Sequence, residues 1–224
     1  MRSSHASLAR LTLTLSLALT SVAVIPPARA DAPPITLDAL LSAFAAMPGL
    51  EARYVEEKTM SLLAVPLESR GTIFFAPPGH LLRRVESPRP AELLISEGTL
   101  RMREGDKVQE LDLARRGDVR PLIESLLWLF TGDHAALEKA FHVRFEASAS
   151  GESGSRWTLS LRPRRAPLDK LVGELRLTGE GLAVKTVEVL ESSGDRSVMR
   201  ILDADPRRTF DPSEKRALFG VSGS

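Results

Sequence analysis

The 224-residue chain contains no cysteine, and this absence excludes several classes of protein. Without thiols there is no disulfide framework and no thiolate for catalysis or metal binding. There is also no cysteine near an export signal to which a lipid anchor could be attached. After residue 30 the chain has no second apolar run of bilayer-spanning length, so we expect the remainder to be soluble.

A basic excess is also lacking. The chain has 30 Lys and Arg against 29 Asp and Glu, and three of the basic residues lie within the first 30 positions. The remaining segment therefore has 27 basic and 29 acidic residues, a net charge of −2. Neutralising nucleic-acid phosphates requires a clustered basic excess, so we expect no nucleic-acid partner.

Motifs that carry catalysis are missing as well. Beyond residue 30 the histidines are His80, His134 and His142, without an H-x-x-x-H pair, and no G-x-S-x-G sequence occurs. Glu56 and Glu57 are adjacent carboxylates, but neighbours on a strand point to opposite faces and cannot share a substrate. We interpret them as part of a solvated edge strand. The sequence predicts no enzyme, no metal site and no cofactor.

The first 30 residues have the features of a secretory signal. Arg2 and Arg10 make a basic start, Leu11–Ile25 is a 15-residue apolar run, and an A-x-A motif ends at Ala30. The alternative is an uncleaved anchor, but the run is short for a span of roughly 20 residues. We predict cleavage after Ala30 and export of residues 31–224 to the bacterial periplasm, a length that suits a single domain.

Short strands dominate the rest of the pattern. In the segment 70–98, prolines stand only at turns, where a missing N–H costs no ladder hydrogen bond. The segment 119–130 is apolar nearly all round, which is typical of a helix buried on several sides. Flanking helices are expected at 36–47 and 134–141, and a last one from Asp211. Strands are expected at 52–62, 70–76, 80–86, 91–96, 99–103, 108–113, 143–147, 156–162, 171–178, 182–191 and 197–202.

Ten or eleven strands with about three helices indicate an α+β fold. We expect one strongly curved antiparallel sheet, a half-barrel, whose concave face is covered by the helices. Such a sheet encloses a volume, and small apolar residues leave that volume unfilled. This geometry suits the holding of an acyl chain.

Several weak motifs occur in an order that is typical of one family. After the signal and the first helix come the strand Arg53–Glu56, the segment Pro66–Phe74, prolines 78 and 88, the turn Leu94–Gly98, the apolar helix, and a W-x-L-x-L strand at 157–161. In this order the chain resembles the periplasmic outer-membrane lipoprotein carriers, the LolA family, over roughly residues 35–202.

The resemblance implies a soluble periplasmic carrier that holds the acyl chains of lipoproteins, or of related lipid-like cargo, in an apolar cavity. Partners would be an inner-membrane donor transporter and an outer-membrane acceptor, with the carrier a monomer. Leu81 matches the family's cavity mouth, so the implied cavity residues are Leu81, Phe75, Leu126 and Trp128. The alternative is a non-transporting module of the same fold that senses lipid or protein at the envelope.

Two features depart from the family pattern. Pro77 stands where the family commonly has an arginine that latches the helical lid, so this latch is missing or differently built. No F-x-F-x-x-P strand occurs near the C-terminus, and residues 205–221 look helical instead. The chain is therefore similar to a divergent branch of the family.

A compact basic loop is the remaining candidate site. Arg162, Arg164 and Arg165 lie within four residues of one another. One interpretation is a solvated turn between two strands. The other is a docking patch for acidic partner proteins or anionic lipid headgroups, near which each base adds about 1 kcal/mol.

The export prediction is directly testable. Expressed with its first 30 residues in a Gram-negative host, the protein should appear in the periplasmic fraction with Asp31 as its first residue. Intact-mass measurement and N-terminal sequencing check this. Recovery in the membrane fraction alone, with residue 1 retained, would contradict it.

Overall fold

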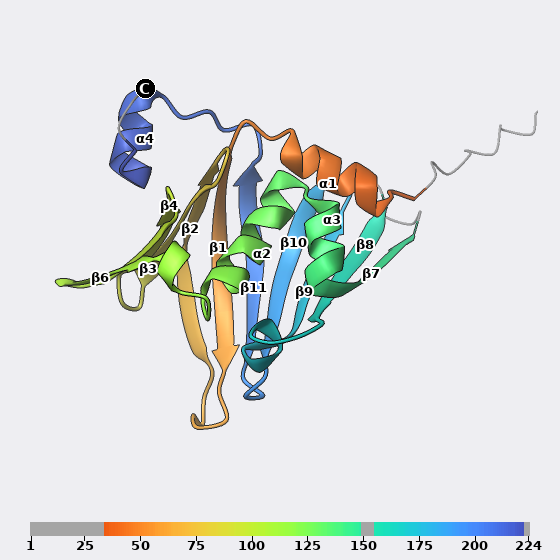
Figure 1. Ribbon diagram of the computed structural model, residues 1–224, viewed down its shortest axis with the longest axis horizontal. Helices are drawn as coiled ribbons and strands as arrows, with labels where there is room; N and C mark the ends of the chain where they lie inside the picture. Colours follow the sequence, from red (N-terminus) through yellow and green to blue (C-terminus); the bar gives the residue numbers. More distant parts are fainter. Residues whose placement is uncertain (1–33, 149–154, 222–224) are drawn as a thin grey trace, which may run out of the picture. The chain divides into compact units, whose positions relative to one another are not determined.

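The computed structural model describes residues 34–148 and 155–221. The predicted signal, and most of the predicted hairpin turn at 151–155, lie outside these residues. Within them, the expected α+β architecture is confirmed: one open antiparallel sheet with helices packed against it (Figure 1).

The sheet has eleven strands in the order β6-β5-β4-β3-β2-β1-β11-β10-β9-β8-β7, all neighbours being antiparallel. In chain order the strands are β1 Leu50–Thr59, β2 Leu67–Ala76, β3 His80–Ser87, β4 Ala91–Ser96, β5 Thr99–Glu104, β6 Lys107–Asp112, β7 Phe141–Ser148, β8 Arg156–Pro163, β9 Val172–Glu180, β10 Ala183–Glu191 and β11 Arg196–Asp205.

Strand β1 occupies the centre of the sheet, between β2 and β11. The interpretation of Glu56 and Glu57 as part of an edge strand is therefore wrong. Their opposite orientation is confirmed by burial, because the Glu56 side chain is only 17% exposed whereas Glu57 is exposed. On its other side β1 pairs with β11, whose residues lie 137 to 154 positions away along the chain, and local sequence does not reveal this pairing.

The described residues form four α-helices, one at each of the four places where the sequence predicts a helix: α1 Leu37–Ala45, α2 Arg120–Thr131, α3 His134–Ala140 and α4 Pro212–Phe219. Thr36 caps α1, its Oγ1 accepting from the Ala39 N–H at 3.2 Å. Asp211 and Glu214 form a capping box at the start of α4. The expectation of helix from residue 205 is wrong, because β11 continues to Asp205 and an extended segment precedes α4.

Helices α1, α2 and α3 cover the concave face (Figure 1). Alternate residues of β7, β8 and β9 point to them, since successive strand side chains face opposite ways. This largest cluster consists of Leu40, Leu41, Phe44, Leu129, Leu137, Phe141, Trp157, Leu159, Leu161, Leu168, Leu175 and Leu177.

Helix α4 packs on the other face of the sheet, over β3 and β4. Phe219 is 1% exposed, and its ring lies 5.6 Å from that of Phe210 in an edge-on arrangement. These two rings cover Phe74, Leu82 and Leu94, which point outward. The sheet is therefore apolar on both faces at β2–β4, which explains why these strands lack a simple apolar–polar alternation.

Gly71 allows strands β1, β2 and β3 to approach closely. It lies opposite Tyr54 in the register, and the Tyr54 ring reaches across it towards β3. A Cβ at position 71 would lie 1.9 Å from the Arg84 carbonyl oxygen and 2.9 Å from Tyr54 Oη. A side chain there has no room unless the backbone moves.

Gly71→Ala should therefore lower the free energy of unfolding by about 1–3 kcal/mol, the usual cost of overpacking. The matched control is Gly173→Ala in β9, where an added Cβ meets its nearest atom at an ordinary 3.5 Å. Urea denaturation of both variants provides the measurement. Equal stability of the two would show that position 71 is not sterically restricted.

Candidate functional site

An apolar floor lies on the concave face of β2–β5, and α2 covers it. Phe75 is 1% and Leu81 7% exposed, and Ile95 and Leu100 lie beside them. From α2, Ile123, Leu127 and Phe130 pack onto this floor, and Phe130 stacks on Phe75 with ring centroids 4.6 Å apart. The floor is filled by the helix in this conformation.

The four predicted cavity residues fall into three places. Phe75 and Leu81 lie together on the floor beneath α2. Trp128 is half-buried and packs on the larger cluster with α1. Leu126 is half-buried and belongs to none of the three clusters.

The residues of α2 that cover the floor are others. Ile123, Leu127 and Phe130 follow a helical spacing of four and three residues, which places them on one face. That spacing was visible in the sequence. It does not single out one face, however, because the helix is apolar nearly all round.

Helix α2 rests on the sheet through apolar contacts alone. Among the described residues, the side-chain hydrogen bonds of α2 stay within the helix: Arg120 to Glu124, Ser125 to the Leu122 carbonyl, and Thr131 to the Leu127 carbonyl. No hydrogen bond or ion pair between α2 and the sheet occurs in this part of the chain.

Neighbouring helices hold the C-terminal end of α2. Gly132 ends the helix in the left-handed conformation, with φ 68°. A Cβ there would lie 2.6 Å from the Leu41 carbonyl oxygen of α1. His134 of α3 and Asp38 of α1 are joined through Nδ1 and Oδ1 at 2.7 Å. A polar contact thus joins α3 to α1, and the end of α2 lies close against the α1 backbone.

A polar cluster interrupts the concave face beside the apolar floor. Arg83 bonds Glu56 through its terminal nitrogen, and its Nε donates to Tyr54 Oη at 3.1 Å. Ser69 donates to the same Glu56 carboxylate at 3.3 Å. Burial raises the pKa of Tyr54, an effect that the Arg83 charge partly offsets. This cluster joins β1, β2 and β3 on the face that α2 covers.

Arg83 and Arg84 are neighbours on β3, so strand alternation sends their side chains to opposite faces. Arg84 lies on the outer face, where its Nε donates to Glu92 at 2.9 Å. The Arg83–Glu56 pair was missed because the two residues are 27 positions apart and meet only through the strand register.

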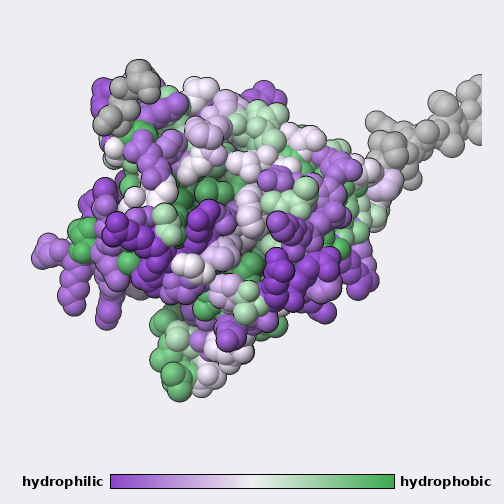
Figure 2. All heavy atoms as spheres, viewed as in Figure 1, coloured by the Kyte–Doolittle hydropathy of each residue, from purple (hydrophilic) through white to green (hydrophobic). Residues whose placement is uncertain are grey.

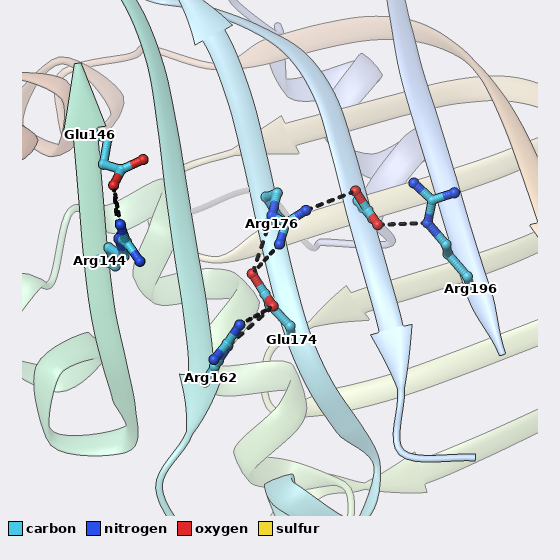
Figure 3. Close-up of polar contacts among 7 residues, drawn as sticks. Arg144, Glu146, Arg162, Glu174, Arg176 and Arg196 are labelled. Atoms are coloured by element: carbon cyan, nitrogen blue, oxygen red, sulfur yellow. Dashed lines mark hydrogen bonds and ion pairs between the residues drawn. The ribbon is translucent and has the colours of Figure 1, made fainter. Parts of the chain in front are cut away.

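The outer face of β8–β11 has a chain of alternating charges (Figure 3). Glu174 accepts from Arg162 at 3.1 Å and from Arg176 at 2.9 Å, and Glu188 joins Arg176 to Arg196. Burial alone would raise the pKa of Glu174, but hydrogen bonds from Arg162, Arg176 and Ser160 lower it below its ordinary value. A groove of about 500 Å³ is lined by Arg162, Glu174 and Arg176 of this chain of charges and by residues of β7 and β8.

The three predicted docking arginines have different environments. Arg162 belongs to this charge chain and remains 67% exposed. Arg164 donates from Nε to the carbonyls of Glu138 and Phe141 at 2.9 and 2.8 Å, which joins the end of α3 to β7. Arg165 is exposed and has no ion-pair partner among the described residues.

The family model described as "Outer membrane lipoprotein carrier protein LolA-like" matches residues 29–207. The chain belongs to this family. The match covers the whole sheet and α1–α3 and ends before α4. A search of the curated proteins finds no significant match.

Solved structures with a similar fold are distant from the chain in sequence. A LolA superfamily protein from Nitrosomonas europaea is 12% identical with a TM-score of 0.41, covering 80% of this chain and 96% of its own. A putative outer membrane lipoprotein-sorting protein domain from Vibrio parahaemolyticus is 10% identical with a TM-score of 0.44, covering 81% and 96%. Pseudomonas aeruginosa MucB, solved with MucA, is 12% identical with a TM-score of 0.45. The match covers 79% of this chain and 59% of the other.

The described residues contain neither a cluster of metal-ligating side chains nor a membrane-spanning helix. No group of three or more His, Asp or Glu side chains there has a geometry that could hold a metal ion. No helix among the same residues is both long and apolar enough to cross a bilayer.

Glu56→Ala should leave the half-buried Arg83 guanidinium without its carboxylate. We expect a loss of about 1.5–3 kcal/mol in the free energy of unfolding, the usual contribution of a hydrogen bond to a charged group. Glu57→Ala removes the exposed neighbouring carboxylate and should change stability by no more than about 0.5 kcal/mol. Denaturant titration measures both. Similar losses in the two variants would argue against a specific role of the pair.

Proposed function

We propose that the protein is a periplasmic carrier that holds acyl chains, of lipoproteins or of related lipid-like cargo, between the concave sheet and α2. Family membership supports a role of this kind. The observation that carries the proposal is the purely apolar contact between α2 and its floor. An acyl chain can replace such a contact without leaving a buried polar group unpaired.

The exchange would proceed as follows. Cargo displaces Ile123, Leu127 and Phe130 from the floor and takes over their contacts with Phe75 and Leu81. Burial of an acyl chain contributes about 0.8 kcal/mol per methylene group, so several methylenes offset the loss of the helix contacts. Leu126 and Trp128, on the same helix, would then line the opened space.

In this proposal the donor is an inner-membrane transporter and the acceptor lies at the outer membrane. Arg162 and Arg165 would form the docking patch for an acidic partner, since both remain exposed. Arg164 would contribute through the position it gives to α3. A non-transporting module that binds the same cargo is the alternative, and transfer to acceptor vesicles or an acceptor protein distinguishes the two.

Leu81→Glu should abolish binding of an apolar fluorescent dye, because an unpaired carboxylate on the floor costs several kcal/mol when cargo excludes water. The matched control is Leu82→Glu, on the same strand and also buried (2% exposed, against 7% for Leu81), but facing α4 on the outer side. Both variants place a carboxylate at a buried position, so far-UV spectra and urea midpoints are compared first.

Dye binding lost in Leu81→Glu and retained in Leu82→Glu would support the proposed site. Binding retained in both variants would place the cargo elsewhere. Mass spectrometry of lipids that co-purify with the periplasmic protein then identifies the cargo, and absence of any acylated molecule would count against a carrier.

A further inference from the structure

The turn between β1 and β2 exposes a cluster of apolar side chains. Leu62 is 88%, Leu63 43%, Val65 69% and Leu67 50% exposed. These are four of the nine large hydrophobic side chains that the described residues expose, and they lie within six consecutive positions. Single exposed apolar residues are ordinary, but a contiguous group indicates an interaction site.

The turn projects beyond the ends of the neighbouring strands at the bottom of Figure 1. In the space-filling view, hydrophobic residues gather on this projection, below a mostly hydrophilic surface (Figure 2). Two hydrogen bonds fix the turn: the Leu63 N–H donates to the Met60 carbonyl at 3.0 Å, and the Ser61 N–H to Asp195 Oδ1 at 3.1 Å. The apolar side chains are thus presented by an ordered hairpin that is tied to the β10–β11 turn.

Charged residues behind the turn are paired with one another. Lys58 bonds Glu191 at 2.6 Å, and Arg70 bonds Glu68 at 2.8 Å. Glu57 and Asp195 add negative charge at the same end of the sheet. These charged residues form a polar collar behind the apolar tip: Glu57, Lys58, Glu68, Arg70, Glu191 and Asp195. The collar has no basic excess, so it does not favour binding to anionic lipid.

We infer that the tip, residues 62–67, inserts into the interface of an electrically neutral lipid bilayer. A projecting tip needs a deep complementary pocket in a protein partner, whereas a bilayer accepts it without a preformed shape. The apolar side chains would lie among the acyl chains and the paired collar at headgroup level. The inference rests on the proposed carrier function, because a carrier must meet a membrane or its proteins to exchange cargo.

The experiment compares two double variants of the full exported chain. Leu62→Glu with Val65→Glu places two charges on the tip. The control, Leu182→Glu with Leu202→Glu, adds the same charge at positions that are 59% and 63% exposed and lie outside the β1–β2 turn. Binding is measured by flotation with phosphatidylcholine–phosphatidylethanolamine vesicles, with and without phosphatidylglycerol, at low and high salt.

We expect the wild type and the control to bind neutral vesicles alike, and the tip variant to bind at least about tenfold more weakly, because two large apolar side chains no longer enter the bilayer. Phosphatidylglycerol should not strengthen binding, and salt should not weaken it. Apolar dye binding should be unchanged in the tip variant, so that loss of the membrane contact is distinguished from loss of the cargo site.

Three results would overturn the inference. The first is equal vesicle binding by the tip variant and the wild type. The second is wild-type binding that requires phosphatidylglycerol and is lost at high salt. This result would indicate that the outer-face arginines, and not the tip, bind the membrane. The third is no vesicle binding at all, with self-association that the tip mutations abolish, which would assign the tip to a contact between two copies of the chain.

Discussion

Apolar contact between α2 and the concave floor is the interaction on which the rest of the structure depends. It closes the sheet on one side and buries Phe75 and Leu81, yet no hydrogen bond or ion pair of the described residues reinforces it. Apolar contact is non-directional and proportional to area, so an acyl chain of similar area can substitute for the helix. A polar latch would have to be broken before cargo entered. Among the described residues, α2 meets the floor through apolar side chains instead.

The sheet is built in a contrasting way. Tyr54, Arg83 and Glu56 join the three strands at its centre, and Gly71 lets those strands approach. On the outer face, Glu174 and Glu188 connect three arginines, and the five residues come from four strands. Hydrogen-bonded charges of this kind are directional and resist displacement. The sheet is thus joined by polar contacts, whereas α2 packs on it through apolar ones.

Much of the fold could be predicted from the sequence, since strand alternation and turn prolines are local signals. Ala91–Ser96 was predicted with its observed bounds, and Asp211 was recognised as a helix cap. Contacts made by distant segments could not be predicted. The Arg83–Glu56 pair depends on register, the central place of β1 depends on pairing with β11, and α4 covers outward residues that look like core. The exposed tip at 62–67 was not predicted either, because Leu62 was assigned to the end of the strand 52–62 and its exposure depends on how far the hairpin projects.

Locking the lid tests the central claim most directly. Gly79 faces Leu127 of α2, and an added Cβ would lie 3.7 Å from Leu127 Cδ1. Because the chain has no cysteine, Gly79→Cys with Leu127→Cys can be joined by oxidation or by a short thiol crosslinker without side reactions. The account predicts that the joined form loses binding of an apolar dye or fatty acid and that reduction, or omission of the crosslinker, restores it. Unchanged binding by the joined form would contradict a site beneath α2.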